Sequence, residues 1–414
     1  MTRMKESGIE WIGQIPEEWE VDFVNHIFEE HKQKNKGNKE KNLLSLSYGR
    51  IIRKSIDTSF GLLPESFDTY NIIQRGDIVL RLTDLQNDKR SLRVGLAREN
   101  GIITSAYLTL RLKNICCSDS YMYYLLHTYD ICKVFYNFGG GVRQGGTWSD
   151  IYKMELLIPP KNEQQKIADF LDKKTAQLDK VKDLLEEQIQ KLKDYRASLI
   201  YETVTNGLDK TVPMKDSGIN WIGQVPEGWE ISKIRYLVTT RSEKRITDSS
   251  IPYIGLENIE SQTGKFVETG IQVDKSENIV VEIGDVLFGK LRPYLRKYWR
   301  ATFPSTASSE FLVFQSSELD MNFLYYAIQS DSFIEEVNTS TYGSKMPRAS
   351  WEYIKNMKIT FPSSLVEQQK IANLLDEKTA QIDNLIQIKN QQIKNINKQR
   401  QTLIYDYVTG KRRV

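Results

Sequence analysis

Cysteine and histidine are scarce in this chain of 414 residues. The three cysteines (Cys116, Cys117, Cys132) are too few and too irregularly spaced for a disulfide framework, and we expect a reducing, cytoplasmic setting. The three histidines complete no CxxC or HExxH spacing with them, so the sequence predicts no zinc site. We interpret all six as ordinary packing or surface residues.

Long hydrophobic runs and an excess of one charge are also missing. The N-terminal stretch MTRMKESG lacks the apolar segment of a signal peptide, and we find no apolar run of about eighteen residues that would predict a membrane span. Lys and Arg number 57 against 54 Asp and Glu, a net charge of +3, which neither requires nor excludes a nucleic-acid partner. At this length, a hydrophobic content of 40% predicts a globular chain of two or more domains.

Recognisable catalytic motifs are absent as well. The glycine-rich FGGGVRQGG at 138–146 lacks the GxxxxGK[ST] pattern of a phosphate loop, and we interpret it as a flexible or tight-turn loop. IPPK at 158–161 lacks the acid or amide and the aromatic ring of an adenine methyltransferase site, so it is read as a strand stop. We find no GxSxG elbow and no nuclease-like carboxylate–lysine set. The sequence therefore predicts a chain that is not itself an enzyme and binds no cofactor.

What the sequence does have is an internal repeat, the feature that decides the fold. MKESGIEWIGQIPEEWE at 4–20 and MKDSGINWIGQVPEGWE at 214–230 share thirteen of seventeen positions. EQQKIADFLDKKTAQLD at 163–179 and EQQKIANLLDEKTAQID at 367–383 also share thirteen, and SLIYETVT at 198–205 matches TLIYDYVT at 402–409. The segments between these repeats differ in sequence and share only a few short matching stretches. This contrast is typical of two binding modules with one frame and different specificities, although a duplicated domain that has drifted would look similar.

Two long helices are expected at 161–207 and 365–414, each after a variable module, at 1–160 and 208–364. Leucine or isoleucine recurs at heptad spacing, which predicts a coiled coil; the residues are Leu171, Leu178, Leu185, Leu192, Leu199, Leu375, Ile382, Ile396 and Leu403. We place the second seam at Ile167, Lys174, Val181, Gln188 and Tyr195, and at the equivalent positions of the second helix. Lys389 breaks this pattern, and Ile386, Ile388 and Ile393 either widen the core face or mark a partner surface. Because domain termini are often close together, the helices are expected to run antiparallel.

Basic and aromatic residues cluster in both variable modules. VLFGKLRPYLRKYWR at 286–300 has five cations and no acid, and the stretch 81–98 is similarly basic. Such clusters suit phosphate contacts and guanine recognition, or they form an ordinary solvated face. The candidate DNA contacts are Arg81, Lys89, Arg90, Arg93, Arg143, Gln144, Lys290, Arg292, Arg296, Lys297, Lys345 and Arg348.

In duplicate and in this order, the WIGQxPExW, GD(I/V)L and EQQKIAxxLD motifs resemble the specificity subunit of type I restriction–modification enzymes over essentially the whole chain. The resemblance implies two target recognition domains, each reading one half of a bipartite, asymmetric double-stranded DNA target. It implies that the helices form a spacer that sets half-site distance and docks two modification subunits. Those subunits would carry S-adenosylmethionine and methylate adenine, and restriction (translocase) subunits would use ATP and Mg²⁺.

The predicted architecture is therefore α+β: two similar recognition domains, each a mixed sheet plus helices, separated by two long antiparallel coiled-coil spacer helices with a pseudo-twofold internal repeat. The alternative is a coiled-coil scaffold whose end domains bind proteins rather than DNA. A self-sufficient methyltransferase is disfavoured by the missing motifs. Salt-sensitive binding to a split DNA sequence would distinguish the first hypothesis from the second.

Overall fold

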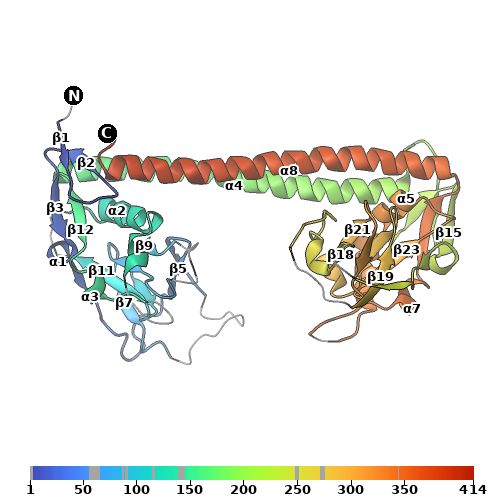
Figure 1. Ribbon diagram of the computed structural model, residues 1–414, viewed down its shortest axis with the longest axis horizontal. Helices are drawn as coiled ribbons and strands as arrows, with labels where there is room; N and C mark the ends of the chain where they lie inside the picture. Colours follow the sequence, from blue (N-terminus) through green and yellow to red (C-terminus); the bar gives the residue numbers. More distant parts are fainter. Residues whose placement is uncertain are drawn as a thin grey trace. The chain divides into compact units, whose positions relative to one another are not determined.

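The structure is a computed structural model that describes residues 3–55, 66–85, 88, 92–113, 117–138, 145–247, 251–270, 276–343 and 345–414. The chain divides into two compact units, which we call unit 1 (Met1–Leu185 with Gln391–Val414) and unit 2 (Glu186–Asn390). Two long helices, α4 (Lys161–Asn206) and α8 (Leu365–Val408), each contribute one part to each unit (Figure 1). Both helices are followed closely by a glycine with a φ of +70°, Gly207 and Gly410, the left-handed conformation that ends many helices.

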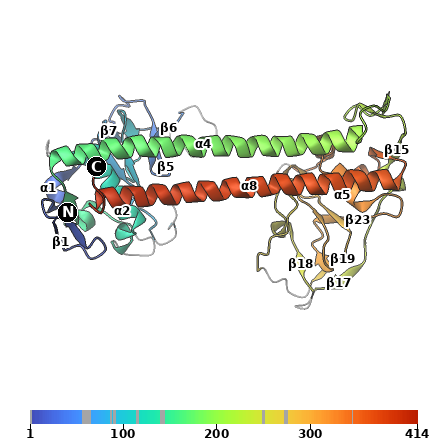
Figure 2. The same cartoon turned by 90° about the horizontal axis from the view of Figure 1, so that it is seen from above.

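The long helices pair in opposite directions within each unit. In unit 1, Glu163 and Asp179 of α4 bind Arg413, just beyond α8, and Arg400 of α8, at 2.8 Å in both pairs. In unit 2, Gln188 and Arg196 of α4 contact Lys389 (2.6 Å) and Asp383 (3.7 Å) of α8. Rising residue numbers in α4 therefore meet falling numbers in α8, and the predicted antiparallel pairing is confirmed in both units (Figure 2).

The prediction of the second seam is confirmed only near the start of each helix, at the buried Ile167 and Ile371, and is wrong farther along. Leu171, Leu375 and Ile382 of the leucine seam are buried and its other members are half-buried. At the positions we assigned to the partner seam, however, Val181 is 46% and Tyr195 57% exposed. The inward-facing residues lie four positions after each leucine, and most are polar; they are Thr175, Lys182, Ile189, Arg196 and Thr203 in α4.

The shifted seam also explains the isoleucines that did not fit the heptad. Ile386 and Ile393 are half-buried on the equivalent face of α8, so they widen its core stripe, whereas Ile388 is exposed. The Lys389 ammonium, at a leucine-seam position, donates a hydrogen bond to the Gln188 side chain of α4. A lysine is tolerated there because its charge reaches a polar partner at the edge of the pair.

Unit 1 contains a four-stranded antiparallel sheet in the order β4 (Phe28–Glu30), β11 (Leu108–Leu112), β8 (Ile78–Leu80) and β9 (Val94–Leu96). Smaller antiparallel pairs are β1 (Met4–Glu6) with β2 (Gln14–Pro16), β3 (Glu20–Phe23) with β12 (Glu155–Ile158), β5 (Leu44–Ser47) with β6 (Arg50–Arg53), and β7 (Asn71–Ile73) with β10 (Gly101–Ile103). The shorter helices are α1 (Val24–Ile27), α2 (Asp119–Ile131), η1 (Val134–Asn137) and α3 (Trp148–Ile151).

Unit 2 repeats the four-stranded sheet as β16 (Thr239–Thr240), β23 (Phe311–Gln315), β20 (Val286–Gly289) and β21 (Tyr298–Arg300). It repeats two of the pairs as β13 (Met214–Asp216) with β14 (Gln224–Pro226), and β15 (Trp229–Lys233) with β24 (Lys358–Pro362). A second sheet, β17 (Lys244–Ile246), β19 (Glu277–Val281), β22 (Ser305–Ala307) and β18 (Tyr253–Ile254), replaces the remaining pairs. The short helices are η2 (Ile234–Tyr236), η3 (Leu256–Asn258), η4 (Pro293–Leu295), α5 (Met321–Ala327), α6 (Asp331–Thr339) and α7 (Trp351–Ile354).

The duplicated sequences form a frame of matching contacts. The buried Trp19 donates its indole hydrogen bond to Glu163 in the first turn of α4 (3.0 Å), and the buried Trp229 donates to Glu367 in the first turn of α8 (3.2 Å). Each tryptophan also lies against the end of the other long helix, because a Cβ at Gly410 would lie 3.3 Å from Trp19. The buried tryptophans of the repeated frame therefore pack against the long helices.

Each unit buries helix ends in its own core. The core of unit 1 includes Leu171 from the start of α4 and Ile404 from the end of α8. The core of unit 2 includes Ile200 from the end of α4 and Leu375 from the start of α8. Because burial of each such side chain contributes about 1.5–3 kcal/mol, the helix ends are structural parts of the modules.

Loss of the tryptophan–glutamate bond should weaken unit 1. Trp19→Phe keeps an aromatic ring but removes the donor to Glu163, so we expect the free energy of unfolding to fall by about 1.5–3 kcal/mol, as for other hydrogen bonds to a charged group. Urea unfolding measures this loss. Trp11→Phe is the control, because a ring at position 11 still packs against Tyr129; equal effects of the two variants would show that the bond to Glu163 contributes nothing.

Candidate nucleic-acid interface

The predicted contact residues of unit 2 lie on two loops that are bonded to each other. One loop follows β20 and the other precedes α7. The Arg292 backbone N–H donates to the carbonyl oxygen of Pro347 (2.7 Å), and its guanidinium donates to that of Lys345 (3.2 Å). The fold therefore brings Lys290 and Arg292 beside Lys345 and Arg348, which are distant in the sequence.

Unit 1 has the same junction between equivalent loops. The Gly146 N–H, in the loop before α3, donates to the carbonyl oxygen of Leu82, which follows β8 (2.7 Å). Most of the candidates on these two loops lie outside the described residues; they are Lys89, Arg90, Arg143 and Gln144.

Two arginines of unit 2 are held by carboxylates. Arg348 donates two hydrogen bonds to the Glu310 carboxylate (2.9 and 3.1 Å), and these bonds raise the pKa of its guanidinium. Arg296 forms an ion pair with Asp331. Both guanidiniums are thereby fixed in place, and a phosphate would have to compete with the carboxylate or share the arginine with it.

The three predicted lysines of unit 2 differ in their surroundings. The Lys297 ammonium donates to the carbonyl oxygens of Leu256 (2.8 Å) and Ile259 (2.6 Å), and partial burial lowers its pKa. Lys297 therefore ties two loops of the module together. Lys345 is exposed and Lys290 half-buried on the joined loops, so these two lysines are better placed for a phosphate.

Exposed apolar side chains accompany the lysines, and sequence reasoning did not select them. Tyr294 is 52% exposed, Tyr342 64% and Met346 55% on the same two loops. Aromatic rings beside cations suit contacts to bases and sugars. Tyr294 stands in the basic stretch 286–300, but no sequence signal distinguishes an exposed Tyr342 from a buried one.

Arg93 does not lie at a surface, and its prediction as a DNA contact is at odds with the structure. Its side chain is fully buried. Its guanidinium donates to the hydroxyl of Tyr136 (3.1 Å) and to the carbonyl oxygens of Arg81 (3.0 Å), Thr83 (2.7 Å), Asp84 (3.3 Å) and Asp88. Arg93 therefore holds the loop after β8 from inside, because one guanidinium can satisfy several inward-facing carbonyls.

The backbone of Arg93 is bound as firmly as its side chain. Its N–H donates to the Asp130 carboxylate of α2 (2.6 Å), and burial raises the pKa of that carboxyl to about 6. Arg81, which emerges from the loop that Arg93 supports, is partly exposed and paired with Asp88 (3.2 Å). Arg81 therefore stays a candidate for direct contact.

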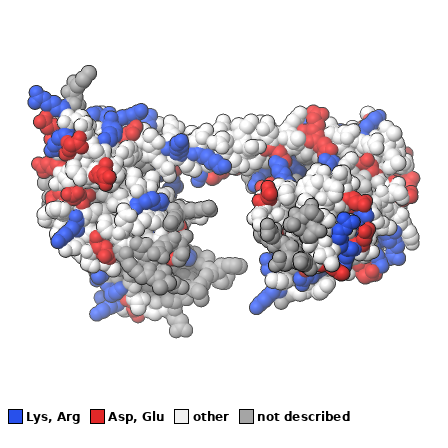
Figure 3. Space-filling model, in the orientation of Figure 1, with Lys and Arg blue, Asp and Glu red and all other residues white. Residues whose placement is uncertain are grey.

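Charge on the visible face of each unit is mixed (Figure 3). On the face drawn in Figure 3, blue Lys and Arg side chains are interspersed with red Asp and Glu on each unit. In the part of the chain that the structure describes, no three His, Cys, Asp or Glu side chains gather as a metal ion would require. The described helices include none that is long and apolar enough to cross a membrane.

Comparison with known proteins finds the same two modules that the structure shows. The family model for the type I restriction modification DNA specificity domain matches residues 16–193 and 226–398, once around each recognition module. The chain is 25% identical to the type I restriction enzyme MjaVIII specificity subunit of Methanocaldococcus jannaschii, over 97% of this chain and 94% of the relative. It is 22% identical to the EcoDI specificity subunit of Escherichia coli, over 72% and 70%.

The fold is shared with a solved chain from a study of complex assembly and conformational transition of a type I restriction–modification system. The TM-score is 0.64 at 14% identity, covering 95% of this chain and 98% of that one. These comparisons give no support to the alternative of a protein-binding scaffold. The family model matches twice, in the two segments that share the repeated frame, and these two matches together cover most of the chain. The chain therefore belongs to the family of type I restriction–modification DNA specificity subunits.

Proposed function

We propose that each unit reads one half of a bipartite, asymmetric duplex DNA target. The observation that carries this proposal is the contrast between a repeated frame and unrepeated loops. Tyr124 binds Asp172 at 2.8 Å in unit 1, and Tyr326 binds Asp376 at 2.6 Å in unit 2. The loops after β8 and β20 share their place in the fold but not their cations, so the two half-sites must differ in sequence.

We further infer that α4 and α8 set the half-site separation and dock two modification subunits. Val181 and Leu184 of α4 are exposed apolar residues one turn apart, and so are Leu385 and Ile388 of α8, 204 positions later. An apolar pair at the same place in both repeats suits two copies of one partner, because each copy would meet the same side chains.

A specificity subunit of this family is not the catalyst. We propose that the modification subunits supply S-adenosylmethionine and methylate adenine, and that restriction (translocase) subunits use ATP and Mg²⁺. This assignment places the assembled complex with the DNA in the cytoplasm. The contribution of this chain is to position the DNA, through its loops, against groups carried by its partners.

The test is to co-express the chain with the modification subunit of its host and map adenine methylation across the genome. We expect one split, asymmetric motif. An assembled, active complex that methylates no such motif would contradict the proposal. Binding of the assembled complex to a duplex with that motif should weaken steeply with salt, whereas salt-insensitive capture of a protein would favour a scaffold.

A further inference from the structure

One aspartate of each long helix is shared by two cations that come from two other elements. In unit 1, Asp179 of α4 binds Arg400 of α8 (2.8 Å) and Arg50, the first residue of β6 after the tight β5–β6 turn. In unit 2, Asp383 of α8 is paired with Arg196 of α4 (3.7 Å) and with Lys265 (3.0 Å). Asp179 and Asp383 are equivalent positions of the repeat, and so are Arg196 and Arg400.

The second cation belongs to a tight turn of the variable module in both units. The turns read Tyr48–Gly49–Arg50 and Thr263–Gly264–Lys265, and their glycines have φ values of +77° and +69°. A side chain at position 264 would meet the Tyr325 hydroxyl at 2.5 Å. Both turns therefore need a glycine, for its φ and, in unit 2, for lack of space.

A tyrosine binds the backbone of each turn. Tyr123 donates its hydroxyl hydrogen bond to the Gly49 carbonyl oxygen (3.2 Å), and Tyr325, its equivalent, donates to that of Thr263 (3.5 Å). The turns lie in segments that otherwise differ, since the first closes the β5–β6 hairpin and the second follows η3. We call the arrangement of turn, tyrosine and shared aspartate the turn junction.

The next tyrosine makes a second bond from module to helix. Tyr124 donates to Asp172, which also binds Arg98 (3.1 Å). In unit 2, Tyr326 donates to Asp376, and Arg300, from the strand position equivalent to Leu96, lies 3.1 Å from that carboxylate. The module is therefore attached to the long helices at two separate points, this bond and the turn junction.

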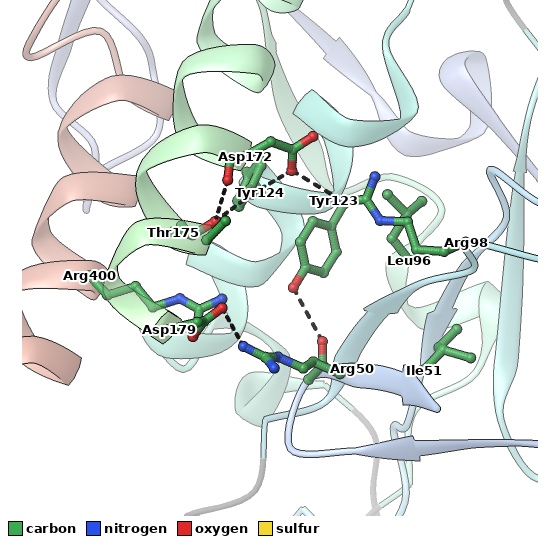
Figure 4. A pocket seen from close by; sticks show the side chains of 12 residues that line it. Arg50, Ile51, Leu96, Arg98, Tyr123, Tyr124, Asp172, Thr175, Asp179 and Arg400 are labelled. Carbon is green, nitrogen blue, oxygen red and sulfur yellow. Dashed lines mark hydrogen bonds and ion pairs between the residues drawn. The ribbon is translucent and has the colours of Figure 1, made fainter. Parts of the chain in front are cut away.

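Unit 1 depends more on charge at its junction. A cavity of about 270 Å³ lies beside it, lined by Leu96, Tyr123 and the three arginines Arg50, Arg98 and Arg400 (Figure 4). In unit 2, Tyr298 stands at the strand position equivalent to Val94, is buried, and donates its hydroxyl hydrogen bond to the Gln262 carbonyl oxygen. The turn of unit 2 therefore has a packed aromatic support that the turn of unit 1 does not have.

We propose that Asp179 and Asp383 are positioning residues that orient each recognition module on the spacer helices and so determine which half-site separation is accepted. One carboxylate links both helices and the module, so the module can tilt only if the helix pairing is disturbed too. A recognition module must then carry a glycine turn followed by Arg or Lys to be accepted by this frame, whatever bases it reads. This inference rests on the proposed function.

The test compares Asp179→Asn with wild type in the complex assembled with modification subunits. Substrates carry the mapped half-sites at native separation and one base pair shorter or longer. We expect the methylation rate at native separation to fall by about tenfold, because a small misplacement of a bound group costs about this much or more. We also expect a smaller difference in rate between the native separation and the separations that are one base pair shorter or longer. The bases read in each half-site should not change.

Asp183→Asn is the matched control, since Asp183 is exposed on the same helix one turn away. Arg50→Lys should behave as wild type, because unit 2 has Lys265 at this place, whereas Arg50→Gln should behave as Asp179→Asn. Arg50 is exposed, so its variants are expected to fold even if Asp179→Asn does not.

The inference is overturned if Asp179→Asn and Arg50→Gln keep the rate and the separation preference of Asp183→Asn, or if they change the bases that are read. Failure of the proposed function would look different, because the wild-type complex would then methylate no split motif at all.

Discussion

Insertion of one heptad into both long helices, after Leu185 and after Asn390, is expected to reduce methylation of the native motif at least about 100-fold. Both insertion points lie at the boundary between the units, so the contacts within each unit are retained. Seven residues keep the leucine seam in register and add about 10 Å to the helix pair, a length of about three base pairs of DNA.

The bases of both half-sites should survive this insertion. Any motif that the variant methylates should contain the native half-sites with a longer spacer. Three added base pairs also rotate the second half-site by about 100° around the DNA axis, so the residual rate reports how far the complex can twist. Methylation mapping of the co-expressed complex measures both the bases and the spacer.

An insertion into α4 alone is the control. It makes the antiparallel partners unequal in length between Asp179–Arg400 in unit 1 and Arg196–Asp383 in unit 2, and we expect loss of assembly by size-exclusion chromatography. A paired insertion that rewrote the half-site bases would contradict the assignment of base reading to the modules and of spacing to the helices.

Arg93→Ala should lower the free energy of unfolding of unit 1 by about 3–5 kcal/mol. The substitution leaves the carbonyls of Arg81, Thr83 and the rest of the loop after β8 without their shared donor, and each buried acceptor without a partner costs about 1–3 kcal/mol. Denaturant unfolding of the full chain, followed by tryptophan fluorescence, measures the loss.

Arg81→Ala is the matched control for Arg93→Ala. The Arg81 side chain is 30% exposed and forms a partly screened ion pair with Asp88, so its loss should cost less than about 1 kcal/mol. If Arg93→Ala unfolded like wild type and lost only recognition of one half-site, Arg93 would be acting at the DNA surface after all.

The sequence indicated which residues belong to the repeated frame, but not which of them contact each other. That Trp19 and Glu163 belong to a frame follows from their duplication as Trp229 and Glu367. That each tryptophan donates to its glutamate does not follow, because the partners are 144 and 138 residues apart. The identical contact in both units then explains why both ends of the pair were kept.

The pattern of hydrophobic residues predicted the long helices but not which residues pair between them. Leucines every seven residues predicted the long helices, and α4 and α8 begin and end close to the expected residues. The partner seam was misplaced because the inward positions are largely polar, Thr175 and Arg196 among them. Such residues form a seam only when a charge or hydroxyl faces them across the pair, as Asp383 faces Arg196.

By itself the sequence determined the duplication, the long helices, the division into two modules of one frame, and the family. These features are local or repeated, so residue order displays them. Only the tertiary structure decided which cation supports a loop from inside, which is fixed by a carboxylate, and which lies free on the joined loops. Arg93 and Arg81 look alike in sequence; burial and the direction of nearby carbonyls, set by residues far along the chain, separate them.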